Sequence, residues 1–353
     1  MSGTSESKAK VSGKVGWKSP SNIALVKYWG KHGRQYPSNP SVSFTLSNAF
    51  TETTVEYVHD ENRKDRPSWR FTFVGKEKPA FEKKILAYLN GIADVYPLIA
   101  QLDLTIDSAN TFPHSSGIAS SASAMSALAL CLEDIAASVE DRTMDYQIAS
   151  HLARLGSGSA SRSVYGPLVI WGESGDVSSA SQDHAIPYDE GIDPIFETFH
   201  DDILIISAQE KAVSSRAGHA LMDGNPYAQS RFDQAHRHLS EILAAMKKGD
   251  LQTFGTIVEK EALTLHALMM ASDPPYMLME PATLSAIRMI KNFRQAKGIP
   301  VYFTLDAGPN IHLLYPAEVS VAVAGLVEDL RTFCAEGVVI NDKVGSGPSK
   351  LSI

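Results

Sequence analysis

The segment TFPHSSGIASSASAMSALALCLEDIAA, residues 111–137, decides how this chain of 353 residues folds. It begins with Pro, Gly and Ser residues, which favour a loop, and continues as an alanine-rich apolar stretch. Such a stretch is best accommodated as a buried helix. The preceding residues 102–110, LDLTIDSAN, alternate apolar and polar side chains as a strand does. The predicted order is therefore strand, small-residue loop and buried helix.

The loop in this segment presents a surface that suits phosphate. Backbone amides and hydroxyls uncovered by bulky side chains are offered by Ser115, Ser116, Gly117, Ser120, Ser121 and Ser123. Free amides at a helix N-terminus and the helix dipole both favour an anion there. No Gly-Lys-Ser/Thr closes the loop as in a Walker sequence, and the glycine spacing of a dinucleotide fingerprint is absent. On these residues alone, a phosphate site and a serine-rich helix cap both remain open.

The flanking sequence predicts strands and helices on both sides of this segment. Upstream, from about Val15, short runs such as NIALVKYWG (22–30), SVSFTLS (41–47) and TETTVEYV (51–58) predict a sheet. A helix is predicted within residues 79–96 and another at the start of residues 146–166, followed by the strand PLVIWGE (167–173). A polar stretch from about residue 173 to residue 193 then marks a join between two domains.

The second half of the chain repeats the mixture of helices and strands. The predicted elements are a strand at 201–209, helices at about 226–248, 251–270 and 281–297, a hairpin at 300–316, a helix at 318–336 and a strand at 338–342. Several antiparallel signals favour an α+β fold over a doubly wound sheet. Because the length exceeds what one core usually serves, two domains are expected. The predicted division is a disordered tail (1–14), an N-terminal domain (15–195) and a C-terminal domain (196–353).

Composition narrows the classes of function. With 32 basic and 40 acidic residues the formal net charge is −8, and the basic residues are scattered, which argues against a nucleic-acid partner. The chain is 44% apolar without a run approaching about 18 apolar residues, so a soluble protein is expected. Two cysteines support neither a disulfide framework nor a thiolate metal site and fit a reducing cytoplasm. The eleven histidines form no ligand pattern, so no metal site is assigned to protein side chains.

The segment NIALVKYWGKHG, residues 22–33, carries two lysines and a phenol where a predicted strand ends. Lysine is a compact charge that can meet phosphate oxygens or keep a catalytic carboxylate ionised, which suits phosphoryl transfer. Lys27, Tyr28 and Lys31 are therefore candidate site residues. The alternative is that these lysines merely flank a core tryptophan at the end of a strand.

A carboxylate and two arginines complete the candidates. In YFTLDAGPN, Asp306 ends a strand before a forced turn, a position from which it could orient or deprotonate a hydroxyl. An ordinary turn aspartate is the alternative. Arg162 and the loop Ser214-Ser215-Arg216 offer guanidinium groups, whose planar geometry suits carboxylate or phosphate.

Together and in this order, the segments resemble the GHMP kinase superfamily, which includes galactokinase, homoserine kinase, mevalonate kinase and phosphomevalonate kinase. They are most similar to its diphosphomevalonate decarboxylase family. KYWGK (27–31) and DAGPN (306–310) mark this branch, whereas the serine loop alone would indicate only the superfamily. The resemblance spans roughly Ser19 to Pro348.

This resemblance implies a ribosomal-S5-like N-terminal domain, a ferredoxin-like C-terminal domain and a cleft between them. It implies a cytoplasmic homodimer of the mevalonate pathway of isoprenoid biosynthesis, with no membrane partner. ATP, with Mg²⁺, would contact Pro113, Ser115, Ser116, Gly117, Ala119, Ser120, Ser121 and Ser123.

The resemblance also implies roles in catalysis. Asp306 matches the catalytic aspartate, Lys27 its partner, and Arg162 the arginine that meets the substrate carboxylate. Substrate contacts are implied for Tyr28, Lys31, Ser159, Arg162, Ser215 and Arg216. The implied reaction phosphorylates the C3 hydroxyl of mevalonate 5-diphosphate and then releases carbon dioxide and phosphate, which gives isopentenyl diphosphate and ADP.

Three alternatives remain open: a monophosphate substrate, 3-phosphorylation without decarboxylation, and a non-catalytic ligand sensor with the same fold. The sequence also departs from the family pattern in two places. Asn39-Pro40-Ser41 stands where Asn-Ser-Ser is usual, and His114-Ser115-Ser116 where Thr-Ala-Ala is common. The first departure concerns local substrate contacts, and the second concerns the fit of ATP.

Overall fold

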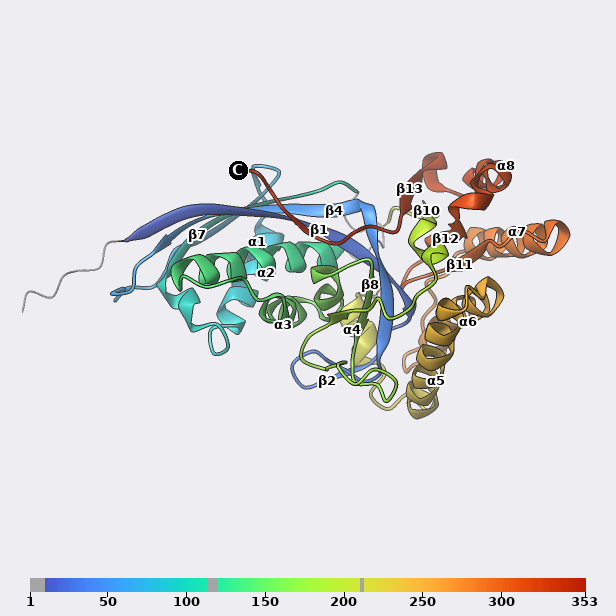
Figure 1. Cartoon of the computed structure of the whole chain (residues 1–353), viewed down its shortest axis with the longest axis horizontal. Helices are drawn as coiled ribbons and strands as arrows, with labels where there is room; N and C mark the ends of the chain where they lie inside the picture. Colours follow the sequence, from blue (N-terminus) through green and yellow to red (C-terminus); the bar gives the residue numbers. More distant parts are fainter. Residues whose placement is uncertain (1–9, 113–119, 210–212) are drawn as a thin grey trace, which may run out of the picture.

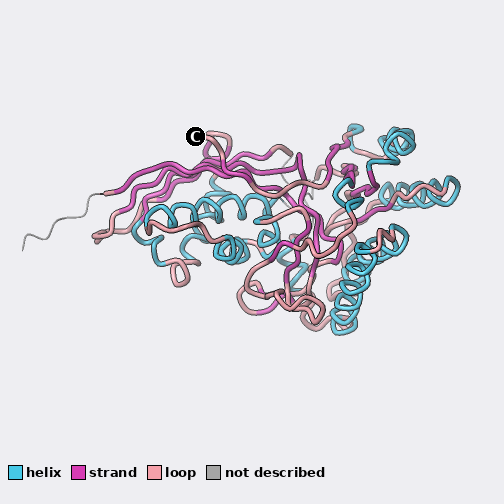
Figure 2. Tube along the Cα trace, in the orientation of Figure 1, coloured by secondary structure: helices cyan, strands magenta, loops and turns pink. Residues whose placement is uncertain are grey.

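Two β-sheets of unequal size organise the computed structural model, which describes residues 10–112, 120–209 and 213–353 (Figures 1 and 2). The larger sheet has the order β14-β1-β4-β7-β5-β6, and β8 also pairs with β4 and β9. Its strands are β1 (Val11–Val26), β4 (Ser41–His59), β5 (Trp69–Phe73), β6 (Lys76–Glu77), β7 (Leu102–Asn110), β8 (Leu168–Trp171), β9 (Ile186–Pro187) and β14 (Ser349–Lys350).

The smaller sheet has the order β11-β12-β10-β13 and is antiparallel throughout. Its strands are β10 (Phe199–Leu204), β11 (Tyr302–Thr304), β12 (Ile311–Pro316) and β13 (Val339–Lys343). A separate short hairpin pairs β2 (Lys31–His32) with β3 (Tyr36–Pro37). The predicted α+β fold and the hairpin within residues 300–316 are confirmed.

Helices cover both sheets. The larger sheet carries α1 (Pro79–Gly91), α2 (Ser120–Val139) and α3 (Tyr146–Gly156) on one face, and the smaller sheet lies near α5 (Ala228–Lys247), α6 (Leu251–Met270), α7 (Pro281–Lys297) and α8 (Ser320–Arg331) (Figure 1). The short helix α4 (Ser215–Ala220) lies between the two groups in sequence. Single 3₁₀ turns are η1 (Pro97–Gln101), η2 (Gly158–Val164), η3 (Pro194–Thr198), η4 (Ala317–Val319) and η5 (Ala335–Gly337).

The helix predicted from residues 111–137 is the central helix of the larger sheet. Most of α2 is buried, including Leu128, Leu130 and Leu132. By length and composition α2 is the one helix in the described ranges that could cross a membrane, but 78% of that window is buried inside the protein. Its apolar character is therefore explained by its place in the core.

The two longest strands correct the sequence-based boundaries. Because β1 pairs with β4 from Val11 onward, residues 11–14 form a strand and do not belong to a disordered tail. The separate runs predicted at 41–47 and 51–58 join into the single strand β4. Its pairing with β1 is interrupted between Thr45 and Phe50, where the chain bulges.

The bulge in β4 joins the two sheets. The amides of Ser47, Asn48 and Ala49 donate to the buried carboxylate of Asp342 on β13. These amides lie outside the ladder between β1 and β4, so the carboxylate satisfies donors that would otherwise be unpaired. The chain then returns to the larger sheet, where β14 pairs with β1. Sequence periodicity did not predict this return.

A substitution at Gly255 would test how closely α6 packs on the smaller sheet. A Cβ at Gly255 would lie 2.0 Å from the Tyr302 ring, whereas a Cβ at Gly325 in α8 would meet nothing within 4 Å. We predict that Gly255→Ala lowers the free energy of unfolding by about 1–3 kcal/mol through overpacking, despite alanine's higher helix propensity.

Gly325→Ala is the matched control, since it changes the same residue type inside another helix. It should raise the free energy of unfolding by up to about 1 kcal/mol. Urea unfolding followed by circular dichroism measures both variants. Equal stabilisation by the two substitutions would show that α6 does not pack closely on Tyr302.

Candidate active site

Lys27 and Asp306 meet where the two sheets approach each other. Lys27 follows the last residue of β1, and Asp306 follows β11 at the turn that the sequence predicted. Lys27 Nζ lies 3.0 Å from Asp306 Oδ1, and the two side chains are 2% and 27% exposed. Burial lowers the pKa of Lys27, while the charge and hydrogen bond of Asp306 oppose that shift. The pair thus combines a buried cation with a carboxylate that is open to a ligand.

The carboxylate of Glu261 binds the backbone amide of Lys27. Its Oε2 accepts the Lys27 amide hydrogen at 2.8 Å, and Arg231 donates to both carboxylate oxygens at 2.7 and 2.5 Å. His238 Nδ1 lies 2.5 Å from Oε1. Burial alone would raise the pKa of Glu261, but Arg231, His238 and the Lys27 amide together lower it to about 2. The carboxylate is therefore ionised inside the protein.

Sequence reasoning missed this network. Glu261 is completely buried, although it lies in a helix whose apolar pattern was recognised. A charged residue on an apolar helix face is a signal of a buried ion pair, because burial without a partner is costly. The partners themselves could not be named, since Arg231 and Glu261 are brought together only by the packing of α5 on α6.

Arg162 is a buried cation with neutral partners. It is 3% exposed, and its guanidinium donates to the side-chain oxygens of Asn22, Ser41 and Ser43 at 2.8–3.3 Å. No carboxylate in the described ranges forms an ion pair with it. Burial lowers the pKa of Arg162 to about 10, partly offset by the charge of Asp306. A cation held in this way is suited to an anionic ligand.

The departure at residues 39–41 supports this geometry. Asn39 Nδ2 donates to the carbonyl oxygen of Lys27 at 3.0 Å, and Ser41 Oγ accepts from Arg162 at 2.8 Å. Asn39 Oδ1 is buried without a partner in the described part of the chain. Pro40 therefore lies between two residues that contact the candidate site, and it leaves both contacts in place.

The remaining predicted substrate residues lie around this centre. Lys31 begins β2, and its Nζ donates to Gln35 Oε1 at 2.8 Å. Burial and then the charge of Arg216 lower the pKa of Lys31, so the two cations repel each other. Ser215 and Arg216 are exposed in the first turn of α4. The carbonyl of Ser159 accepts from Asn22, which also contacts Arg162.

Tyr28 belongs to a row of aromatic rings that runs from β8 to α4. Its ring centroid lies 4.8 Å from that of Trp171 on β8 and 4.3 Å from that of His219 on α4. His219 in turn lies 4.5 Å from Trp29. Burial raises the pKa of Tyr28, so its hydroxyl stays protonated. The histidine was not among the predicted site residues.

The structure describes only part of the predicted ATP loop. Pro113, Ser115, Ser116, Gly117 and Ala119 lie outside the described residues, as does the departure at His114. Ser120 begins α2, and the hydroxyl of Ser121, an exposed residue, lies 3.2 Å from that of Ser157.

Ser123 corrects the predicted set of ATP contacts. It is fully buried, and its hydroxyl lies 2.6 Å from that of Thr51. Since it is turned into the core, its side chain is not available to a nucleotide. The serine instead joins the start of α2 to the larger sheet.

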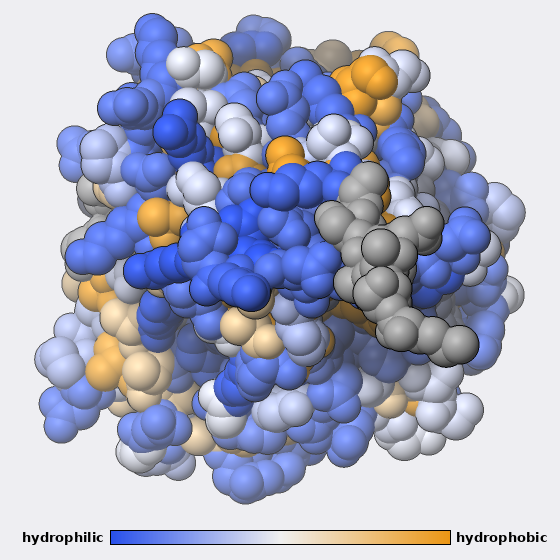
Figure 3. All heavy atoms as spheres, turned by 90° about the vertical axis from the view of Figure 1, so that its left-hand side faces the viewer, coloured by the Kyte–Doolittle hydropathy of each residue, from blue (hydrophilic) through white to orange (hydrophobic). Residues whose placement is uncertain are grey.

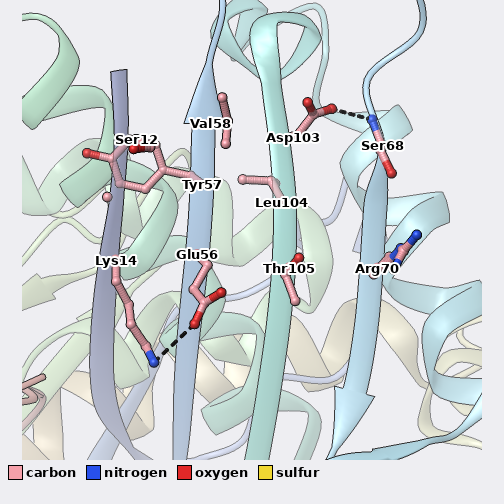
Figure 4. Close-up of a pocket in the computed structure, with 11 residues that line it drawn as sticks. Ser12, Lys14, Glu56, Tyr57, Val58, Ser68, Arg70, Asp103, Leu104 and Thr105 are labelled. Atoms are coloured by element: carbon pink, nitrogen blue, oxygen red, sulfur yellow. Dashed lines mark hydrogen bonds and ion pairs between the residues drawn. The ribbon is translucent and has the colours of Figure 1, made fainter. Parts of the chain in front are cut away.

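A groove of about 670 Å³ lies elsewhere, at the opposite end of the larger sheet. It is lined by residues near Ser12 and Lys14 at the start of β1, roughly 40 Å along the strand from Lys27 at about 3.3 Å per residue. Within it Lys14 pairs with Glu56, and Asp103 accepts from the Ser68 amide (Figure 4) and also pairs with Arg63. The surface at that end is largely hydrophilic (Figure 3). Lys27 and Asp306 remain the candidate active site, because a buried cation there lies beside a partly exposed carboxylate.

The described residues contain no group of three or more His, Cys, Asp or Glu side chains that could hold a metal ion. Magnesium, however, is commonly held by one or two carboxylates together with substrate phosphates. The partly exposed carboxylate of Asp306 fits that set of donors. The site therefore suits a magnesium ion that arrives with a nucleotide.

Glu261 makes the stability of this site depend on pH. Because its pKa is depressed from 4.5 to about 2, the associated stability is present above pH 4.5 and is lost as the pH falls toward 2. That stability is on the order of 3 kcal/mol. We predict that Glu261→Gln lowers the free energy of unfolding at pH 7 by about 3–5 kcal/mol, since Arg231 is left buried without its counter-ion.

Between pH 4.5 and pH 2, the free energy of unfolding of Glu261→Gln should fall much less than that of the wild type. Glu259→Gln is the matched control on the same helix, because Glu259 pairs with the partly exposed Arg294 and does not contact Lys27. Its effect should be smaller. Urea titrations at a series of pH values decide the matter, and an unchanged acid dependence in Glu261→Gln would contradict the prediction.

Comparison with known proteins shows the family of the chain. Residues 19–183 match the diphosphomevalonate decarboxylase-like N-terminal domain, and residues 202–350 match the mevalonate 5-diphosphate decarboxylase C-terminal domain. Diphosphomevalonate decarboxylase of Aspergillus fumigatus is 30% identical over 90% of this chain and 80% of its own. Among solved structures, mevalonate diphosphate decarboxylase of Staphylococcus aureus is 28% identical, with a TM-score of 0.82 over 98% of this chain and 99% of its own.

A solved complex of MDDEF with MVAPP, AMPPCP and magnesium is also similar, with 28% identity and a TM-score of 0.81 over 97% of this chain and 100% of that chain. The two domain models together span most of the sequence, and the structural likeness extends over nearly all of it. The chain has the GHMP-kinase fold and belongs to the diphosphomevalonate decarboxylase family.

Proposed function

We propose that this enzyme converts mevalonate 5-diphosphate and ATP into isopentenyl diphosphate, ADP, phosphate and carbon dioxide. The observation that carries the proposal is the buried Arg162, whose hydrogen-bond partners are neutral, within electrostatic range of the Lys27 and Asp306 pair. The pair provides a base beside a cation, and Arg162 provides a site for a carboxylate. The related complex with MVAPP, AMPPCP and magnesium supports the same set of ligands.

Asp306 and Lys27 act in the first step. Asp306 orients the C3 hydroxyl and accepts its proton, and the hydroxyl oxygen attacks the γ-phosphorus of ATP with ADP as the leaving group. Lys27 keeps Asp306 ionised, because the two groups lie 3.0 Å apart and Lys27 is shielded from solvent. Bound Mg²⁺ would offset negative charge on the phosphates.

Arg162 acts in the second step. The C–O bond to the new phosphate breaks, and positive charge develops at C3. The electron pair of the C–C bond to the carboxylate then forms the double bond, and carbon dioxide leaves. The guanidinium of Arg162 holds that carboxylate in place, while the surrounding Asn22, Ser41 and Ser43 fix the orientation of the guanidinium.

The cations at the other end of the site favour a diphosphate. Lys31 and Arg216 lie close enough to lower the pKa of Lys31 by repulsion, and Lys31 is hydrogen-bonded to the neutral Gln35. An anion placed between the two cations relieves that repulsion. A diphosphate brings more negative charge there than a monophosphate.

To test the proposal, the purified protein is incubated with Mg-ATP and either mevalonate 5-diphosphate or mevalonate 5-phosphate. ADP and carbon dioxide are measured together. We expect equal amounts of both products with the diphosphate. ADP without carbon dioxide would indicate a 3-kinase, and turnover of the monophosphate alone would indicate a phosphomevalonate decarboxylase. The absence of both products would favour a ligand sensor.

Asp306→Asn provides a second test. We predict a loss of at least about 10²-fold in kcat, because the amide cannot accept the proton, with nucleotide binding largely unchanged. Asp189→Asn, a change at an exposed position, is the control. Turnover by Asp306→Asn at the wild-type rate would remove the assigned base.

Three further features complete the proposal. We place the enzyme in the cytoplasm, consistent with its two free cysteines, and assign it to the mevalonate pathway. The family suggests a homodimer. A division between domains near residue 195 agrees with the gap between β9 of the larger sheet and β10 of the smaller one.

A further inference from the structure

His219 is a buried ring that the proposed mechanism does not use. It is 8% exposed, and it lies on α4 between the rings of Tyr28 and Trp29. Its Nδ1 lies 3.1 Å from the backbone nitrogen of Gly30. The residue thus connects the helix that carries Arg216 to the segment that carries Lys27 and Lys31.

The hydrogen bond to Gly30 determines where the imidazole proton lies. A backbone N–H can only donate, so Nδ1 must accept and carries no hydrogen. Burial and then the charges of Lys31 and Arg162 lower the pKa of His219 to about 3, so the ring is neutral at physiological pH. The one proton of the neutral ring is therefore on Nε2, which is a fixed hydrogen-bond donor.

Nε2 has no hydrogen-bond partner in the described part of the chain, and it is not one of the buried polar atoms there that lack a partner, so it keeps some access to solvent. The charges of both Lys31 and Arg162 act on the ring. In the proposed function these two cations hold opposite ends of the substrate, the diphosphate and the carboxylate. The ring lies on the helix that carries Arg216 and 4.3 Å from the ring of Tyr28, which follows Lys27 in the chain. A neutral donor in this position can meet an oxygen of the molecule that joins those ends.

We propose that His219 is a substrate-binding residue, which donates its Nε2 hydrogen to an anionic oxygen of the phosphorylated hydroxy acid held by Lys31 and Arg162. This inference rests on the proposed function and adds a contact to it. A neutral donor contributes directional recognition without adding a third positive charge to Lys31 and Arg216. The ring row of Tyr28, His219 and Trp29 holds the imidazole in the required orientation.

The rival explanation is that His219 has only a structural role, in which its hydrogen bond to Gly30 fixes the position of α4. Two substitutions distinguish the explanations, because each retains the hydrogen-bonding role of only one ring nitrogen. In His219→Asn the side-chain oxygen can replace Nδ1 as the acceptor for Gly30, but the donor at the far edge is lost. In His219→Gln the amide nitrogen reaches the position of Nε2, whereas the acceptor for Gly30 is lost.

Steady-state kinetics with mevalonate 5-diphosphate and ATP test the proposal, with thermal unfolding as a control for folding. We expect His219→Asn to raise the KM for mevalonate 5-diphosphate roughly 10- to 100-fold, as for loss of a hydrogen bond to a charged group. His219→Gln should stay within about threefold of the wild type. The KM for ATP should be unchanged in both variants.

A wild-type KM in His219→Asn, or a larger defect in His219→Gln than in His219→Asn, would overturn the proposal. If the wild-type protein has no turnover, the proposed function fails. Calorimetric titration of the three proteins with mevalonate 5-diphosphate still tests His219, because the same order of affinities is expected. Equal affinity of all three proteins would contradict the added contact.

Discussion

The buried carboxylate of Glu261 is the interaction on which the rest of the site depends. It joins Arg231 and His238 of α5 to the Lys27 amide at the end of β1. Arg231 also donates to the Lys27 carbonyl at 3.0 Å. An ion pair sealed from water is costly to form and more costly to break, so this one restricts the relative position of α5, α6 and β1. The position of Lys27 opposite Asp306 follows from that restriction.

The candidate site is positive although the chain is acidic overall. Lys27, Arg162 and Arg154 are each nearly sealed from solvent. Arg154 Nε donates to the Asp183 carbonyl, and its guanidinium lies 4.3 Å from the centroid of the Tyr36 ring. It thereby supports the hairpin of β2 and β3, which carries Lys31. Buried cations are thus used in two ways: Arg154 orients the hairpin, and Arg162 faces the ligand.

Close packing between the two sheets explains why these contacts persist. Asp342 collects three amides at the bulge in β4, and the rings of Trp171, Tyr28, His219 and Trp29 lie in sequence across the site. The contacts of Asp342 therefore join the two sheets, and the ring contacts join the larger sheet to α4. The candidate site is therefore built from elements of both halves of the chain.

The sequence by itself determined the local elements and the residue types of the site. Helical spacing predicted α6 and α7 at their observed bounds, and the motifs identified Lys27, Asp306 and Arg162. These signals are local, because periodicity reports which face of a helix or strand is buried.

Only the tertiary structure decided which residues become neighbours. Lys27 and Asp306 are 279 positions apart, and Gly30 and His219 are 189 apart. The turn of Ser123 into the core and the roles of Glu261 and His219 depend on such contacts. No local pattern reports them, since two helices with the same periodicity can pack in different registers and bring different side chains together.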